Sequence, residues 1–545
     1  MSILDRINKV SDNANARKAW FGLVVAIFVC IIVVPSIYVV TQMFTDWDGI
    51  SDVLADSDKM SVIWRAVGVS FGLAFVVTVF DIIAGLPMAW IMVRKNFRGK
   101  NFLDTLLDMP LAFPTAVLGL SVLMFWGAPE GVDIPGLGLH LSTFMMLVLL
   151  HIIFTYPYMV RSLSGILEQI EPNYETAAMT LGASRWTAVR TITLPLFRAG
   201  LVTGFILCFA RSLSETGGTY IALSILGVES TYFTGPTYIT ENKIGLAPNE
   251  ATPEMILIST IMILLALLLL VAARFVITKM GIKTEKVWPE LGRRLSRGAA
   301  PKLKDGLAIL VLVLFVLVPS FYIFAYLADP GAIDTGKLLS TTGVSFLIAG
   351  VAVIFDIIFG IPVAIYIARH KDGKFAKILD NLVNIPLIVP TTALGVSLAL
   401  FWSATTANSV PAMILVILGH ISFTYPLIVR NITGAIEEVD PSYEETAMTL
   451  GAKPFQAFYK ILLPVIKTSV IAGAILAFTR SLGETGATQA IAGNAVDTVP
   501  IYIVDLVKNG SYPEAAMASI ILIAICFVMM MLVRYITHRG GPRHA

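Results

Sequence analysis

Two pairs of opposite charges recur inside long apolar stretches of this 545-residue chain. Glu215 follows Arg211 by four residues, and Glu484 follows Arg480 by the same spacing. Residues four apart share one face of a helix, so each pair can neutralise itself as an ion pair. An ionisable side chain at mid-membrane costs roughly 2.5–3.5 kcal/mol on insertion scales and therefore needs a reason. The functional alternative is that both arginines face a substrate pathway and attract an anion.

Hydroxyl side chains accompany these pairs. They are Thr115, Thr216 and Thr219 in the first half of the chain, and Thr391, Thr485 and Thr488 in the second half. Neutral donors of this kind suit a small oxyanion that must bind and then be released. Threonines are also common hydrogen-bonding contacts between membrane helices. Both interpretations of these residues stay open.

Four further polar residues repeat within apolar stretches. Asp81 and Asp356 each lie six residues before a proline, and we expect them to bond a hydroxyl or backbone amide of a neighbouring helix. His151 and His420 each open a span, and we expect them to pack at helix interfaces.

Sequence signatures of catalysis are missing from the chain. It contains no G-x-x-x-x-G-K-S/T phosphate-binding loop and no H-E-x-x-H zinc motif. Cys30, Cys208 and Cys526 lie in apolar runs, which argues against a disulfide framework or a thiolate metal site. We expect no catalytic residue, no bound metal and no bound cofactor, so energy for any transport must come from another subunit.

The composition indicates a polytopic membrane protein. Hydrophobic residues make up 56% of the chain and charged residues only 14%, against about 25% charged in soluble domains. The mean hydropathy is +0.80. A membrane helix needs roughly 20 mostly apolar residues, which predicts an all-α protein with twelve transmembrane helices. The expected spans are 19–43, 62–93, 105–126, 139–164, 195–222, 254–278, 305–328, 342–368, 379–402, 411–436, 465–492 and 514–536.

The distribution of positive charge predicts the orientation. Alternate loops are rich in Lys and Arg, whereas residues 44–61 carry five aspartates and one lysine. The basic loops are Arg94–Lys100, Arg274–Lys304, Arg369–Lys377 and Arg534–His544. Basic loops stay in the cytoplasm, so both termini are expected there.

The two sets of six spans are copies of each other. "FDIIAGLP" at 80–87 returns as "FDIIFGIP" at 355–362, and residues 151–183 return as 420–452. Each half has an even number of spans, so the halves insert the same way up, related by an axis along the membrane normal. We expect any substrate path on that axis. The predicted division is 1–278 for the first unit, 279–304 for a basic cytoplasmic linker, and 305–545 for the second unit.

About thirty residues with their own helical pattern join the fourth and fifth spans of each half. Asp440 can cap a helix that starts at Pro441, Gly451 can end it, and Pro454 starts another that should end before Pro464. The first half repeats this pattern. We call each such pair of short helices an elbow. An elbow fits a docking surface for a partner present in two copies, or an amphipathic loop in the lipid headgroups.

The elbow sequences decide between these alternatives. "YETAAMTLGA" and "YEETAMTLGA", each followed by Leu-Pro, resemble the EAA motif of ABC importer permeases, E-A-A-x-x-x-G and then L-P. The resemblance covers nearly the whole chain as two permease units in tandem. It implies that the coupling residues are Thr176, Ala177, Ala178 and Gly182, and Glu445, Thr446, Ala447 and Gly451. Thr176 stands where the motif has glutamate, which puts equal coupling by the two halves in doubt.

The same resemblance implies partners and a location. Two ABC ATPase subunits would bind at 168–194 and 437–463, using ATP and Mg²⁺ themselves. An extracytoplasmic solute-binding protein would dock at 223–253 and 493–512. The chain would lie among lipids in the cell inner membrane and would bind no nucleic acid.

The fifth span also suggests a substrate. "RSLGETGATQAIAGN" resembles a segment of sulfate, molybdate/tungstate and phosphate permeases. Importers of iron(III), thiamine and polyamines share the fold and stay open as alternatives. An ion-gradient-driven secondary transporter also has parallel six-span repeats, but it would not explain the two elbows.

Overall fold

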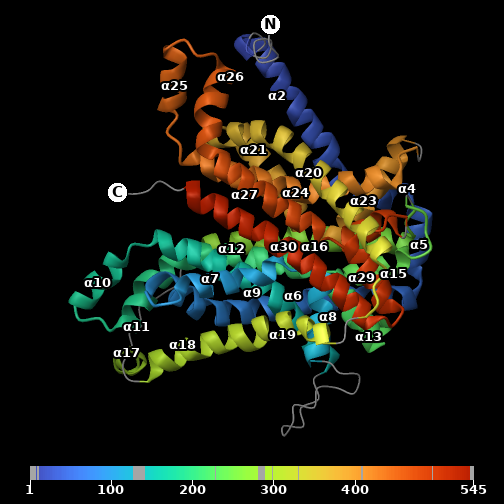
Figure 1. The fold of residues 1–545 in the computed structure, drawn as a ribbon, viewed down its shortest axis with the longest axis horizontal. Helices are drawn as coiled ribbons and strands as arrows, with labels where there is room; N and C mark the ends of the chain where they lie inside the picture. Colours follow the sequence, from blue (N-terminus) through green and yellow to red (C-terminus); the bar gives the residue numbers. More distant parts are fainter. Residues whose placement is uncertain are drawn as a thin grey trace.

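Proline, glycine and long apolar runs together shape the helices of this chain. The computed structural model describes residues 8, 11–126, 142–227, 229–248, 250–279, 289–296, 299–328, 331–406, 409–493 and 495–540. Every regular element within those ranges is a helix (Figure 1). The start of the expected span 139–164, residues 280–288 and 297–298 of the expected linker, and His544 lie outside the described residues.

The helices of the first half run from the N-terminal side to the linker. They are α2 (Ala14–Phe28), η1 (Val29–Val33), α3 (Val34–Ile37), α4 (Val39–Thr45), α5 (Trp47–Ala55), α6 (Ser57–Arg94), α7 (Lys100–Ala112), α8 (Thr115–Trp126), α9 (Thr143–Gln169), α10 (Pro172–Thr180), α11 (Arg185–Ala188), η2 (Val189–Thr193), α12 (Leu194–Leu213), α13 (Gly217–Leu226), α14 (Glu229–Tyr232), α15 (Gly235–Lys243), α16 (Pro253–Lys279) and, in the linker, α17 (Pro289–Ser296).

The second half repeats this order. Its helices are α18 (Ala300–Val311), η3 (Leu312–Leu317), α19 (Val318–Phe321), η4 (Tyr322–Ala328), α20 (Thr335–Arg369), α21 (Lys374–Val383), α22 (Ile385–Ile388), α23 (Thr391–Thr406), α24 (Ala412–Glu437), α25 (Ser442–Thr449), α26 (Pro454–Ala457), η5 (Phe458–Leu462), α27 (Leu463–Leu482), α28 (Gly486–Ala492), α29 (Val499–Lys508) and α30 (Tyr512–Gly540).

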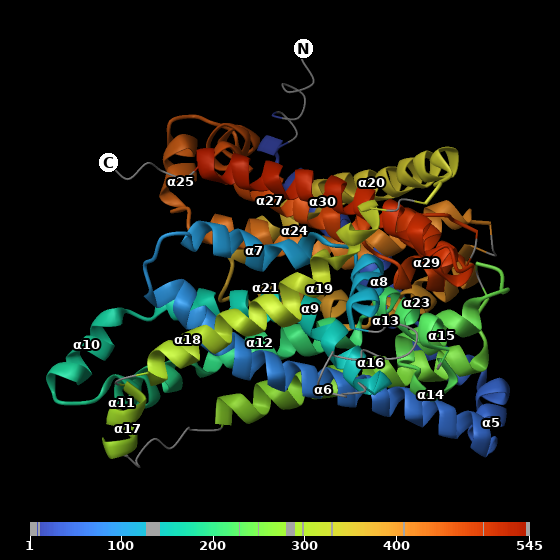
Figure 2. The same cartoon turned by 60° about the horizontal axis from the view of Figure 1, so that its bottom comes forward.

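Among the described residues, eight helices are long and apolar enough to cross a membrane, or up to eleven if each bent pair is one span. The number twelve therefore stays a prediction. Figures 1 and 2 show elbows α10–α11 and α25–α26 apart from each other at one end of the molecule, with α5 and α15 at the opposite end.

The third spans are broken at proline. α7 and α8 meet at 103°, and the corresponding helices of the second half meet at 108°. Phe113, directly before Pro114, has an extended backbone with ψ 131°, and Val389, before Pro390, has ψ 129°. A residue before proline avoids the helical region because of the proline ring, so each pair of helices turns there.

The fifth spans differ from the unbroken helices expected at 195–222 and 465–492. α12 ends at Leu213 and α13 begins at Gly217, and α27 and α28 are separated in the same way. No proline lies at either break. The interactions that stabilise these breaks belong to the candidate site below.

Four π-helical turns each end two residues before a proline, namely Pro35, Pro195, Pro319 and Pro464. The N–H of Leu463, next to Pro464, bonds the carbonyl of Phe458 five residues back. The wider turn accommodates the proline, which lacks an N–H and would clash with the carbonyl four residues back. The elbow's second helix therefore continues into the fifth span, and the expectation that it ends before Pro464 was wrong.

The first span of each half packs against the other half. Phe21 stacks on Tyr366 at 4.5 Å between ring centroids, and Phe28 on Tyr425 at 5.2 Å. In return, Phe315 of η3 contacts Phe80 of α6 at 6.2 Å. The two sequence repeats are thus not two separate packing units (Figure 2).

Two serines connect the exchanged spans at their prolines. Ser397 Oγ of α23 donates to the carbonyl of Pro35 at 2.6 Å and accepts from the N–H of Val39 at 2.8 Å. Ser121 Oγ of α8 donates to Pro319 O at 2.6 Å and accepts from Ile323 N at 2.9 Å. A serine of each half thus makes the same two hydrogen bonds to the first span of the other half.

Candidate translocation pathway and docking elbows

A cavity of about 780 Å³ lies between the two halves. α12 of the first half and α22 and α27 of the second contribute most of its wall, which is largely apolar. Its polar lining residues include Arg211, Ser214, Asn384, Thr391, Thr479 and Arg480. The structure therefore brings both predicted arginines, from equivalent positions of the repeat, to one cavity.

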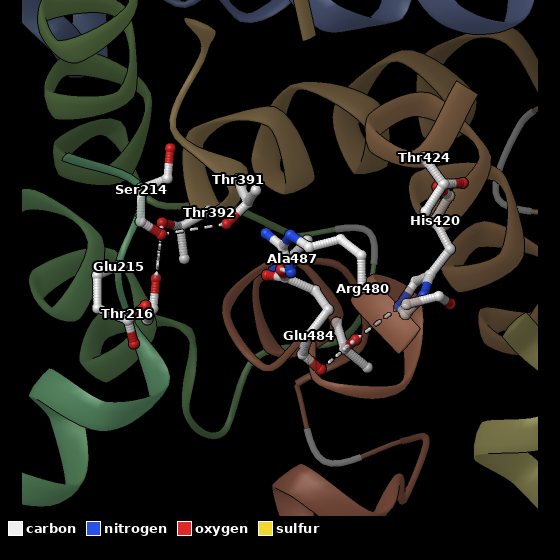
Figure 3. Close-up of polar contacts among 12 residues, drawn as sticks. Ser214, Glu215, Thr216, Thr391, Thr392, His420, Thr424, Arg480, Glu484 and Ala487 are labelled. Carbon is white, nitrogen blue, oxygen red and sulfur yellow. Dashed lines mark hydrogen bonds and ion pairs between the residues drawn. The ribbon is translucent and has the colours of Figure 1, made fainter. Parts of the chain in front are cut away.

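Each arginine forms the ion pair expected from its spacing. Arg211 Nη1 lies 3.0 Å from Glu215 Oε2, and Arg480 Nη1 lies 2.5 Å from Glu484 Oε2 (Figure 3). The arginine side chains keep 15% and 21% of their surface exposed, whereas the glutamates are almost fully buried. A guanidinium has five N–H donors, so pairing with glutamate and lining the cavity are compatible.

An aromatic ring lies beneath each guanidinium. Arg211 lies 4.8 Å from the ring centroid of Phe154, and Arg480 lies 5.1 Å from that of Phe423. Such a ring stabilises a cation away from bulk water. Sequence reasoning missed both residues, although the repeated segments "HIIFTYP" and "HISFTYP" contain them at the same position.

The glutamates also explain the breaks in the fifth spans. Glu215 Oε1 accepts the N–H of Gly218 at 2.9 Å, and Glu484 Oε1 accepts that of Ala487 at 2.9 Å. A carboxylate at a helix N-terminus satisfies a free N–H and matches the helix dipole. Each glutamate thus caps the short helix, α13 or α28, and holds its arginine.

The two halves contact each other closely at these breaks. A Cβ on Gly217 would lie 2.7 Å from Thr485 Oγ1, and Gly486 contacts Thr216 in the reciprocal way. Thr391 Oγ1 also donates to the carbonyl of Ser214 at 3.3 Å (Figure 3). Thr216 and Thr485 therefore lie at a contact between the halves that leaves no room for a side chain on either glycine.

The remaining predicted threonines lie in two places. Thr115 lines a small pocket of about 30 Å³ that both arginines also line. Thr219 and Thr488 are fully buried, and their hydroxyls lie 2.9 Å from Nε2 of His151 and His420 respectively. Thr115 therefore lies close to both arginines. Thr219 and Thr488 instead contact the two histidines.

The two histidines bridge the breaks from the fourth spans. His151 Nδ1 lies 2.7 Å from Ser212 Oγ, before the break, while Nε2 contacts Thr219 after it. His420 makes equivalent contacts, 2.6 Å from Ser481 Oγ on the near side. The expectation of packing residues is confirmed, and each histidine also bonds the helices on both sides of a break.

The intramembrane aspartates occupy equivalent buried positions. Asp356 accepts a hydrogen bond of 2.6 Å from Thr424 Oγ1, as expected. Asp81 is fully buried beside Thr155, the counterpart of Thr424.

Helices α10 and α25, the predicted docking helices of the two elbows, end in the predicted way. Gly182 has φ +93° and Gly451 has φ +92°, values that glycine adopts readily at a helix C-terminus. Asp440 accepts the N–H of Ser442 at 2.8 Å. α25 begins at Ser442, one residue later than predicted.

Apolar side chains on both elbows face outward. Leu181 is 90% exposed and Leu450 84%, with Tyr174 and Tyr443 above half. Most of the predicted coupling residues are exposed, namely Thr176, Ala177, Gly182, Glu445, Thr446 and Gly451. The other two, Ala178 and Ala447, are half-buried. Exposed apolar groups clustered in this way mark an interaction surface.

The end of the molecule opposite the elbows carries the loops expected to meet a binding protein. α14 and α15 lie within 223–253, and α29 lies within 493–512. Lys243, fully buried at the end of α15, donates to the carbonyls of Ala247, Pro248 and Glu250 at 2.6–3.1 Å. These three bonds order the loop that leads into α16.

Both halves of the sequence match one known protein family. The family described as "binding-protein-dependent transport system inner membrane component" matches residues 81–282 and 360–540. The chain belongs to this family. Its two matches coincide with the two repeats, so the chain carries two copies of the permease domain of ABC importers.

Similar permeases are named for different substrates. The ferric transport system permease protein FbpB of Actinobacillus pleuropneumoniae is 23% identical over 93% of this chain and 76% of its own length. The sulfate transport system permease protein CysT of Escherichia coli is 31% identical over 44% of this chain and 94% of its own length. The molybdenum permease protein ModB of E. coli is 37% identical over 30% and 72%. These relatives are permease subunits, not enzymes.

Proposed function

We propose that this chain is the fused permease of an ATP-driven importer that carries a small inorganic oxyanion, such as sulfate, molybdate, tungstate or phosphate, into the cell. The observation that carries this proposal is the cavity between the halves, lined by Arg211 and Arg480 at equivalent positions. Two cations close to one cavity favour an anion. The hydroxyl of Thr391 is a neutral donor on the same wall.

The proposed architecture has twelve spans in two units, 1–278 and 305–545, joined by the linker 279–304, with both termini in the cytoplasm. The halves alternate between opening inward and outward around the cavity. The contact of Thr216 and Gly217 with Thr485 and Gly486 closes the route on the side away from the elbows. The exposed apolar elbows support this orientation, because they fit a cytoplasmic partner.

The proposed partners are two copies of a separate ATPase, one on each elbow, and a solute-binding protein on the opposite face. ATP and Mg²⁺ act in the ATPase, and this chain performs no catalysis. Co-expressed with its ATPase, the chain should isolate with two ATPase copies. A one-to-one complex, or uptake that survives deletion of the ATPase, would contradict this proposal.

Substitution of Arg480 tests whether the substrate carries a negative charge. If the arginine serves an anion, Arg480→Gln should slow uptake while the complex assembles and hydrolyses ATP. If it serves only Glu484, the single change should lower the yield of folded protein, and Arg480→Gln with Glu484→Gln should restore both yield and transport. Full transport by the double variant would defeat the anion proposal and leave the family standing.

Iron(III) is the second candidate, because similarity to the ferric permease FbpB extends over 93% of this chain. Uptake assays in proteoliposomes separate the two candidates. Competition by sulfate or molybdate supports the oxyanion, and uptake of radioactive iron that these anions do not inhibit supports the cation.

A further inference from the structure

An ion pair joins each docking helix to the end of the second span, and it is buried in the first half and partly exposed in the second. Arg94 is the last residue of α6, and its Nη2 lies 3.5 Å from Glu175 Oε1 of α10. Arg369 is the last residue of α20, and its Nη2 pairs with Glu444 Oε1 of α25 at 2.5 Å. Glu175 and Glu444 each lie seven residues before the elbow glycine, so the pair is a repeated feature.

The same arginines also hold the end of the fourth span. Arg94 Nη2 donates to the carbonyl of Ile170, the C-cap of α9, at 2.6 Å. Arg369 Nη1 donates to the carbonyl of Val439 at 2.8 Å, just beyond α24. Each guanidinium therefore joins the end of its own second span to the fourth span and to the docking helix.

In the first half the junction includes the fifth span. Thr193 Oγ1, in the π turn before α12, donates to Glu175 Oε1 at 2.9 Å. Arg94 and Glu175 are each 9% exposed at the side chain. The exposed pair Lys371–Glu437, at the same end of the molecule, has 55% and 37% exposure. A fork-shaped guanidinium suits several acceptors at once, and a buried pair is costly to break.

Each docking helix therefore has one face turned toward the spans and one face exposed. Glu175 points inward to Arg94, whereas its neighbour Thr176 is exposed, and Glu444 and Glu445 divide in the same way. The carboxylate one place before the motif position is thus present in both halves and is engaged within the chain.

We propose that these two Arg–Glu junctions transmit movement of the docking helices to the second and fourth spans. The inference rests on the proposed function, in which an ATPase docks on α10 and α25. Each short helix also contacts the π turn that leads into the fifth span, η2 or η5, but the chain leaves it at Gly182 or Gly451, which are conformationally permissive. The junction makes each helix move with the spans instead of pivoting on its turns. Glu175 and Glu444 are positioning residues, not contacts to the ATPase.

The test measures sulfate uptake per ATP hydrolysed by the complete complex in proteoliposomes, for Glu175→Gln, Glu444→Gln and both together. We expect two ATPase copies to remain bound and hydrolysis to continue, while uptake per ATP falls about tenfold in the double variant, which is within the range for residues on a coupling route. Lys371→Gln is the matched control, because it removes the exposed pair with Glu437 from outside the predicted ATPase-binding segment, and it should leave the ratio unchanged.

A second variant covers the case in which the double change impairs folding. Arg369→Lys keeps the charge but loses the fork that bridges Val439 and Glu444, and it should also lower the ratio. An unchanged ratio in these variants overturns the proposal, and so does loss of ATPase binding, which would make the glutamates docking contacts. If the unmodified complex binds no ATPase, the proposed function fails instead, so the two failures are distinguishable. Where sulfate is not carried, the same ratio is measured with molybdate or iron(III).

Discussion

Gly182 and Gly451 each set the direction in which the chain leaves a docking helix. Both have φ above +90°, and no atom lies within 4 Å of where a Cβ would stand. Space is therefore not the constraint. A residue with a Cβ pays roughly 1–2 kcal/mol in this left-handed conformation, and asparagine pays less than a β-branched residue.

Gly451→Val should therefore weaken docking, while Gly451→Asn should retain most of it. The measurement is the amount of ATPase that co-purifies, together with the uptake rate. Gly434→Ala is the control, because Gly434 lies exposed in α24 with open space around it. Equal docking by the Val and Asn variants would show that backbone strain is not what matters at this turn.

The motif positions facing outward are unequal between the halves. Glu445 can make a charge-assisted contact worth about 1.5–3 kcal/mol with a basic group on the ATPase, whereas Thr176 cannot. Glu445→Ala should reduce transport more than Thr176→Ala, as measured by uptake at equal expression. Equally small effects of the two changes would remove the predicted asymmetry.

Residue spacing predicted the pairs Arg211–Glu215 and Arg480–Glu484 and the elbow glycines. Each of these features depends only on residues close to it in the sequence. Residue spacing did not predict that Glu175 points inward. The partner of Glu175 is Arg94, which is separated from it in the sequence by α7, α8 and α9. Only the packing of α6 against α9 brings the two side chains together.

At the scale of elements, the breaks in the third and fifth spans have different causes. Pro114 and Pro390 break the third spans by local sterics, which act between residues adjacent in the sequence. The break segments of the fifth spans, 213–218 and 482–487, contain glycine but no proline. The break in the first half depends on the capping glutamate and on His151 from another helix, which a pattern of residues along one chain segment does not reveal.

His151→Phe and His420→Phe should each loosen a break while keeping the core filled. Each removes two hydrogen bonds and leaves buried hydroxyls unsatisfied, at a cost of about 1–3 kcal/mol per group. We expect a lower thermal transition and slower uptake in detergent and proteoliposome assays. Ser340→Ala serves as the control, because that exposed hydroxyl bonds only its own helix. Unchanged stability of the His variants would contradict a bridging role.

At the scale of the whole molecule, the serine bridges hold the exchanged first spans. Ser121→Ala should leave the carbonyl of Pro319 and the N–H of Ile323 without this partner, and Ser397→Ala should do the same at Pro35 and Val39. Each change should lower stability by about 1–3 kcal/mol. The two effects should add, since the sites share no partner. Thermal unfolding of the single and double variants measures both, and a double variant no worse than either single one would argue against two independent bridges.

Composition and repetition were enough to predict an all-helical, duplicated membrane protein. They could not predict the exchange of first spans, because two similar repeats offer each span the same kind of surface in its own half and in the other. Aromatic contacts such as Phe28 with Tyr425 identify the partner only after both halves are folded.

The exchange has a consequence for how the protein is made. The first span leaves the ribosome long before its neighbours: Tyr425 follows Phe28 by roughly 400 residues, or about 20–80 s of synthesis at 5–20 residues per second. During that interval its aromatic face has only lipid, or the insertion machinery, beside it. A first half made alone would keep that face uncovered. Joining both halves in one polypeptide ensures that every early span meets its own late partner, at a local concentration independent of expression level.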